Sequence, residues 1–136
     1  MTVTHPLRLN GIAYVEVYVA NTYQSAHFFR SALGFTSIAT SLPGGDATSI
    51  LMKQGDIRLL LTSGNRPESP VAQHVHAHGD TVRDIAFLVD DVEAAFEYAV
   101  TRGGRAVAEP TTIFDDTSDS AVARATIGAP GDTVHS

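Results

Sequence analysis

The chain has 136 residues, of which 43% are hydrophobic, and its formal net charge is −6. This length suits one domain or two very small ones, and the apolar share is sufficient for a packed core. Because the sequence has 9 Lys and Arg against 15 Asp and Glu, nucleic-acid and anionic-membrane partners, which clustered basic side chains bind, are not expected.

The sequence contains no cysteine. Disulfides, thiolate nucleophiles, cysteine-based zinc sites and iron–sulfur clusters are therefore excluded. Any metal site would consist of His, Asp and Glu. The sequence shows neither a signal peptide nor an apolar run of membrane-spanning length, so we expect a cytoplasmic protein.

The first half of the chain predicts a strand, a helix and three further strands. Residues 12–20 (IAYVEVYVA) are rich in β-branched and aromatic residues, which favours a strand. The segment YQSAHFFRSALGF has helical apolar spacing, and Gly34 stands where a helix C-cap is expected. Residues 35–41 predict a short strand, and SILMKQ and IRLLLTS predict two more, joined by a Gly-Asp turn at 55–56.

The second half repeats this order after a polar connector over residues 64–80. Residues 82–89 (VRDIAFLV) predict a strand, and Asp91 is a candidate N-cap for the helix VEAAFEYAVT, which Gly103-Gly104 ends. Further strand candidates follow at 105–108, 111–115 and 121–127. The acidic segment FDDTSDS, with Asp115, Asp116 and Asp119, predicts a solvated turn, because a calcium loop needs Gly and Glu at steps that are missing.

A shift of 70 residues aligns the two halves without a gap, with residues 15–35 over 85–105. The agreement lies mainly in the pattern of strand, polar cap, helix and glycine. A second shift, of 76, places QGDIRLLLTS over PGDTVHS. We therefore predict two βαβββ modules in an α+β fold, with a curled mixed sheet around a shared cavity.

The predicted boundaries are a tail at 1–9, modules at 10–63 and 81–136, and the linker at 64–80. Only Thr133–Ser136 follow the second Gly-Asp turn, whereas a longer strand follows the first. Strands usually extend over ~5–6 residues. We therefore interpret the last strand as truncated and the chain as a fragment; the alternative is a short edge strand.

Paired βαβββ modules resemble the vicinal-oxygen-chelate fold of glyoxalases, bleomycin-resistance proteins and extradiol dioxygenases. More specifically, HGDTVRDIAF and GDTVHS resemble the N-terminal half of the 4-hydroxyphenylpyruvate dioxygenase and 4-hydroxymandelate synthase family. The segments VANTYQSAHFFRSALGF, SILMKQGDIRLLLTS and ATIGAPGDTVHS share this likeness, which extends over residues 10–136.

The resemblance implies a two-domain enzyme whose Fe(II) is held in the C-terminal domain by two histidines and one glutamate. That domain is absent from this chain. The fold's general ligand positions fall here at Tyr14, Asp84 and His135, with Glu16 two residues along the strand from Tyr14. A facial triad needs two histidines and one carboxylate around one metal. We therefore expect these four residues to line the cavity, with no metal and no catalytic residue in this half.

Three histidines, His74, His76 and His78, occupy alternate positions. In a strand all three would share one face, whereas in a helix His74 and His78 would be neighbours. Zn²⁺ would accept either arrangement with a further ligand. Because small and polar residues surround them, we interpret the stretch as a polar connector, with one helical turn near His74.

Asp84 lies within an apolar strand pattern. Burial of an unpaired carboxylate costs several kcal/mol, so a buried Asp84 would need a hydrogen bond or Arg83 or Arg124 nearby. We interpret it as a paired or edge-facing aspartate rather than a pocket carboxylate. His135 would face the cavity if the last strand follows the repeat, and would otherwise lie at a frayed end.

The sequence thus predicts the non-metal N-terminal domain of an Fe(II)-dependent 2-oxo-acid oxygenase that acts on 4-hydroxyphenylpyruvate, as the resemblance implies. Its partners would be the missing C-terminal catalytic domain, a small aromatic 2-oxo acid and further copies in a homo-oligomer. This chain alone would be inactive. The competing hypothesis is a stand-alone small-molecule-binding or antibiotic-resistance protein of the same fold; a glyoxalase-like metal-dependent lyase fits the ligand positions poorly.

Overall fold

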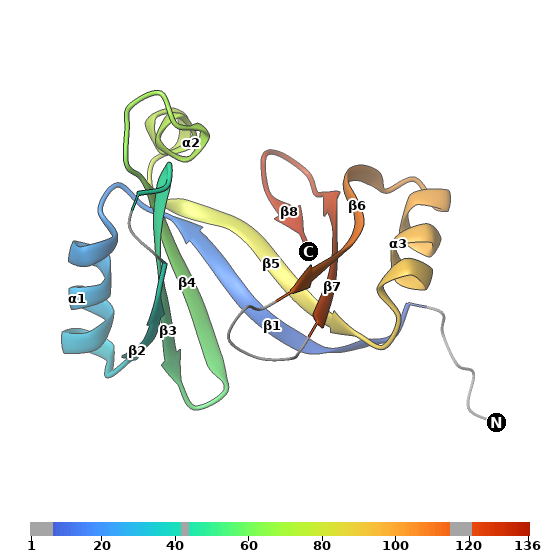
Figure 1. Ribbon diagram of the computed structural model, residues 1–136, viewed down its shortest axis with the longest axis horizontal. Helices are drawn as coiled ribbons and strands as arrows, with labels where there is room; N and C mark the ends of the chain where they lie inside the picture. Colours follow the sequence, from blue (N-terminus) through green and yellow to red (C-terminus); the bar gives the residue numbers. More distant parts are fainter. Residues whose placement is uncertain (1–6, 42–43, 115–120) are drawn as a thin grey trace. The chain divides into compact units, whose positions relative to one another are not determined.

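Figure 1 shows the computed structural model of the chain, which describes residues 7–41, 44–114 and 121–136. The chain divides into two compact units. The first unit is Tyr14–Arg83, and the second is Asp84–Ser136 together with the segment that ends at Ala13. The acidic turn predicted at Asp115, Asp116 and Asp119 lies outside the described residues, as do residues 1–6 of the predicted tail.

The first unit follows the predicted order of strand, helix and three strands. Its elements are β1 (Leu9–Tyr18, which begins in the second unit), α1 (Thr22–Leu33), β2 (Thr36–Thr40), β3 (Ala47–Gln54), β4 (Ile57–Gly64) and α2 (Pro70–His78). The strands lie in the order β2-β3-β4-β1. Because β1 runs parallel to β4 and the other neighbours are antiparallel, the sheet is mixed, as predicted.

The predicted C-cap of α1 at Gly34 is confirmed, and the structure also shows the N-cap. Asn21 caps the N-terminus, where its side-chain oxygen accepts a hydrogen bond of 3.0 Å from the Gln24 N–H. Gly34 ends the helix in the left-handed conformation with φ 77°, which a residue without Cβ adopts most easily. The Gly55 turn between β3 and β4 also has a positive φ, of 56°.

The core of the first unit lies between α1 and the sheet. It consists of the buried residues Val19, Ala26, Phe35, Ile50, Met52 and Leu61, with Val17, Phe29 and Leu59 packed against them. Because side chains alternate along a strand, Leu59 and Leu61 of β4 face the helix, while Leu60 and Thr62 face the other side. That second face carries the polar residues described below.

The second unit has the same order of elements. They are β5 (Thr81–Val89), α3 (Val92–Thr101), β6 (Arg105–Phe114), β7 (Ala121–Gly128) and β8 (Val134–His135). The strands lie in the order β5-β8-β7-β6. The predicted N-cap Asp91 accepts a hydrogen bond of 3.1 Å from the Ala94 N–H, at the position that corresponds to Asn21 under the shift of 70.

One strand, β6, replaces two strands predicted at 105–108 and 111–115. It contains two irregularities in its pairing with β7, between Ala106 and Ala108 and between Ala108 and Thr111. These bulges and Pro110 break the period-two pattern, which is why the sequence indicates two segments. With β6 continuous, the described residues from Thr81 onward form β5, α3, β6, β7 and β8, so both modules are βαβββ and the predicted fold class is confirmed.

The connector contains a nine-residue helix where the sequence predicts a single turn. Ser69 is the N-cap and accepts a hydrogen bond of 3.1 Å from the Ala72 N–H, and Pro70 follows at the start of α2. Because the apolar residues of PVAQHVHAH follow helical spacing only weakly, the sequence does not predict the full length of this helix. No helix in the described part of the chain is long and apolar enough to cross a membrane.

Strand register confirms the two shifts that align the modules. In the parallel pair of the first unit, Val15 lies opposite Leu59, 44 positions apart (59 − 15). In the second unit, Asp84 lies opposite Val134, 50 positions apart (134 − 84). The difference of six equals the difference between the shifts of 70 and 76. Strand β8 therefore occupies the place of β4, although it contains only two residues.

Candidate functional site

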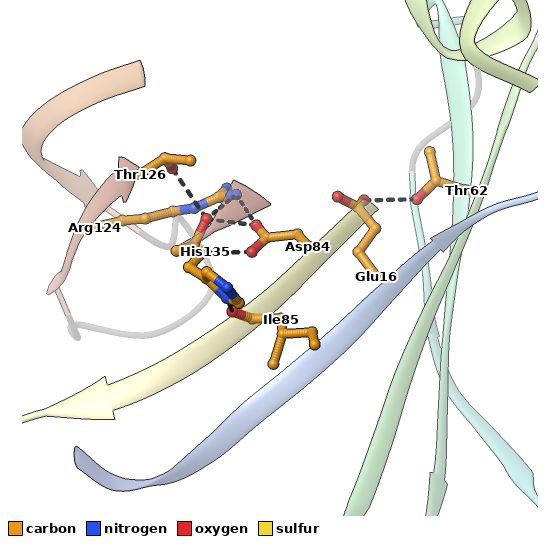
Figure 2. A network of polar contacts seen from close by, with 8 residues as sticks. Glu16, Thr62, Asp84, Ile85, Arg124, Thr126 and His135 are labelled. Carbon is orange, nitrogen blue, oxygen red and sulfur yellow. Dashed lines mark hydrogen bonds and ion pairs between the residues drawn. The ribbon is translucent and has the colours of Figure 1, made fainter. Parts of the chain in front are cut away.

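A row of polar side chains crosses the second face of the first unit. Glu16 of β1 points towards Thr62 of β4, whose hydroxyl donates a hydrogen bond of 2.8 Å to Glu16 Oε2 (Figure 2). Ser49 of β3 lies directly opposite Thr62, with the two hydroxyl oxygens 2.8 Å apart. Because the Thr62 hydrogen is directed to Glu16, the Ser49 hydroxyl donates to Thr62. We call this row the first relay.

A similar row crosses the second unit and is centred on Asp84. Asp84 is buried, and its Oδ1 accepts a hydrogen bond of 2.8 Å from the Ser136 N–H. Its Oδ2 accepts from the Ser136 hydroxyl and from Arg124 Nη2, the latter at 3.2 Å. Thr126 of β7 lies 3.0 Å from the Ser136 hydroxyl. Figure 2 shows Asp84, Arg124 and Thr126 converging. We call Asp84, Ser136 and Thr126 the second relay.

The two relays have the same construction. Glu16 lies opposite Leu60 but bonds to Thr62, two residues further along β4. Asp84 lies opposite Val134 but bonds to Ser136, again two residues further on. In each unit a first-strand carboxylate therefore meets a fourth-strand hydroxyl, which meets a third-strand hydroxyl. The relays differ in charge, because Arg124 forms an ion pair with Asp84.

Arg124 forms an ion pair with Asp84 of the second relay. Its side chain is partly exposed, while the Asp84 side chain is almost fully buried. The guanidinium also donates a hydrogen bond of 3.1 Å to the Ser136 hydroxyl. The interpretation of Asp84 as a paired aspartate, with Arg124 as one of two candidates, agrees with this contact. Sequence reasoning missed Ser49, Thr62, Thr126 and Ser136, since isolated hydroxyl residues carry no pattern.

His135 lies apart from the Asp84 carboxylate. Its Nδ1 is 3.2 Å from Ile85 O, and its ring is 5.2 Å from the Phe87 ring. Because Phe87 is three residues from Asp84 in a strand, their side chains point to opposite faces. The register explains this placement, since His135 occupies the place of Leu59, which packs on the core of the first unit. Ser136 is the residue that meets Asp84.

Tyr14 is half-buried in β1, two residues before Glu16 and on the same face of the strand. Tyr14 and Glu16 belong to the first unit, whereas Asp84 and His135 belong to the second.

The general ligand positions of the fold that fall in the second unit, Asp84 and His135, do not form an iron site. In the second unit the Asp84 oxygens are engaged by Ser136 and by the cationic Arg124, and the His135 ring lies on the other face. Among the residues that the structure describes, no three His, Asp or Glu side chains are grouped as metal ligands would be. A facial triad needs three such ligands. We therefore assign no iron chemistry to these residues.

Comparison with known proteins identifies the family. Residues 3–128 match the family described as hydroxyphenylpyruvate dioxygenase, N-terminal. The chain belongs to this family. The 4-hydroxyphenylpyruvate dioxygenase of Yarrowia lipolytica is 38% identical over 132 residues, covering 92% of this chain and 33% of the relative. That of Neurospora crassa is 34% identical, covering 93% of this chain and 35% of the relative.

Solved structures agree with this assignment. A mutant of 4-hydroxymandelate synthase from Streptomyces coelicolor superposes with a TM-score of 0.85 at 34% identity, covering 93% of this chain and 37% of that one. Methylmalonyl-CoA epimerase from Mycobacterium tuberculosis has a TM-score of 0.75 at 18% identity, which shows a shared fold, and this chain covers 89% of it. The predicted glyoxalase-type fold is confirmed. The chain spans about a third of the length of the dioxygenases that it matches.

Proposed function

We propose that this chain is the non-metal N-terminal domain of a two-domain Fe(II)-dependent oxygenase that acts on 4-hydroxyphenylpyruvate. The observation that carries the proposal is the match of residues 3–128 to the N-terminal family of hydroxyphenylpyruvate dioxygenase. The named dioxygenases and the mandelate synthase both support this assignment. The full enzyme would therefore be either a 4-hydroxyphenylpyruvate dioxygenase or a 4-hydroxymandelate synthase.

In this proposal the iron and the small aromatic 2-oxo acid bind in a C-terminal domain that the relatives' greater length would accommodate. The iron there would bind the 2-oxo acid and activate O₂. Residues 10–136 form one domain whose relays brace the two modules internally rather than hold a metal. The working protein is a cytoplasmic homo-oligomer, and Tyr14, Glu16, Asp84 and His135 have no catalytic role in it.

The test compares this chain with the longer product of its gene. We expect the remaining codons to encode a second pair of βαβββ modules with two histidines and one glutamate as ligands. The longer protein, loaded with Fe(II), should consume O₂ with 4-hydroxyphenylpyruvate, whereas the 136-residue chain should contain no stoichiometric iron and consume none. Stoichiometric iron in the short chain, or a longer product without oxygen uptake, would overturn the proposal.

The second candidate is a stand-alone binding protein of the same fold. It is favoured by fold neighbours of similar length, such as the mycobacterial epimerase, of which this chain covers 89%. Calorimetry of the short chain with 4-hydroxyphenylpyruvate and with neutral aromatic metabolites separates the candidates. Saturable binding to the short chain supports a stand-alone binder, and its absence supports the N-terminal domain.

A further inference from the structure

Helix α2 brings two of the three connector histidines together. His74 and His78 are four residues apart, one turn of an α-helix, and their ring centroids are 4.7 Å apart. His76 lies between them in sequence, but a step of two residues places it on another side of the helix. The sequence predicts a polar connector with one helical turn near His74, whereas the nine-residue helix makes His74 and His78 neighbours.

The surroundings hold one member of this pair in place. The His74 ring packs edge-on against the Tyr18 ring, with centroids 5.2 Å apart, and both of its nitrogens are shielded from solvent. His78, by contrast, is exposed to solvent. Arg83 lies on Tyr18, with its guanidinium carbon 5.9 Å from the ring centroid. All these residues belong to the first unit.

We propose that His74 and His78 form a two-ligand site for a late first-row divalent ion, Cu²⁺, Ni²⁺ or Zn²⁺. Neutral imidazole suits these ions, and Cu²⁺ binds tightest in the usual order of affinities. The ion enters when the exposed His78 ring rotates away from His74, and water completes its coordination. An ion held across one turn fixes both ends of that turn, so it stabilises α2, the helix that links the two modules.

The test uses the untagged full chain, with Cu²⁺ and Ni²⁺ salts alone as probes in isothermal titration. His78→Ala is the test variant and His76→Ala is the matched control, because both remove one exposed imidazole from the same helix. Alanine is the best helix former, so both variants keep α2, which circular dichroism verifies. We expect His78→Ala to weaken binding by about tenfold or more, as loss of one of two ligands should, and His76→Ala to retain the wild-type affinity.

A second readout is the thermal midpoint of unfolding, since an ion that binds only the folded chain raises it. At one Ni²⁺ concentration, the midpoint of the wild type and of His76→Ala should rise by similar amounts, and that of His78→Ala should rise by clearly less. Equal binding by the two variants, or no binding by the wild type, would overturn the site. Because neither readout involves oxygenase activity, these outcomes are independent of the proposed function.

Discussion

Asp84 is the residue on which the attachment of β8 depends. Strand β8 has two residues, so backbone pairing alone gives it few hydrogen bonds. The buried Asp84 carboxylate adds three contacts, to the Ser136 N–H, the Ser136 hydroxyl and Arg124. Hydrogen bonds to a charged group are stronger than neutral ones, so one carboxylate holds the end of the module.

We expect Asp84→Asn to lower the free energy of unfolding by about 1–3 kcal/mol, because charge-assisted hydrogen bonds to Ser136 and Arg124 are lost. Urea unfolding followed by circular dichroism measures the change. Asp56→Asn is the matched control, since Asp56 is exposed in the β3–β4 turn and should change stability by less than about 0.5 kcal/mol. Similar losses in both variants would contradict the anchoring role.

Thr62 tests the first relay in the same way. Thr62→Val keeps the side-chain shape but removes the hydroxyl that donates to Glu16 and accepts from Ser49. We expect a loss of about 1–2 kcal/mol, because two partly buried polar groups each lose one hydrogen bond. Thr36→Val, at an exposed position in β2, is the control for the β-branched exchange. An unchanged midpoint in chemical denaturation for Thr62→Val would show that the relay adds no stability.

At the scale of elements, the close approach of α2 to β4 depends on Gly64. A Cβ placed on Gly64 would lie 2.1 Å from Ser69 Oγ and 2.7 Å from Ala72 Cβ, far inside van der Waals contact. The first turn of α2, including its Ser69 cap, therefore requires glycine at the end of β4.

We expect Gly64→Ala to cost about 1–3 kcal/mol through overpacking, and to reduce protection of the α2 amides in hydrogen exchange. Gly45→Ala is the control, because a Cβ there would lie 3.7 Å from the nearest atom, Ala47 O, which is ordinary contact. If the two variants had the same stability and the same exchange pattern, Gly64 would not set the position of α2.

Some helices and strands can be predicted from sequence patterns alone, and others cannot. Asp91 predicts the start of α3 and Gly34 predicts the end of α1, because a capping residue acts within a few residues of itself. The continuity of β6 could not be predicted, since its bulges are defined by pairing with β7, a partner distant in sequence. The same applies to α2, whose weak helical pattern is supported by packing on β4.

At the scale of the whole molecule, the strands at the ends of the two series limit edge-to-edge pairing between copies of the chain. Strand β6 ends the series β5-β8-β7-β6 and contains Pro110 and two bulges, and β2 ends the other series with one bulge. Such features obstruct edge-to-edge pairing. If copies of the chain associate, side-chain faces rather than these edges are the expected contacts.

We expect Pro110→Val to promote aggregation, because it restores a backbone N–H donor to the edge strand β6. Static light scattering during slow heating should rise earlier for this variant than for the wild type. Ala108→Val, which adds a β-branched residue to β6 without changing its donors, should behave as the wild type. Earlier scattering from both variants would assign the effect to hydrophobicity instead of the edge.

The sequence by itself determined the two βαβββ modules, the helix caps, the hairpin turn and the family, because these depend on local patterns and on segments that repeat along the chain. Only the tertiary structure decided that Ser136 rather than His135 meets Asp84, and that His74 and His78 are neighbours. The physical reason is the same in both cases. Which side chains meet depends on strand register and helix formation, and these are stabilised by contacts between residues far apart in the sequence.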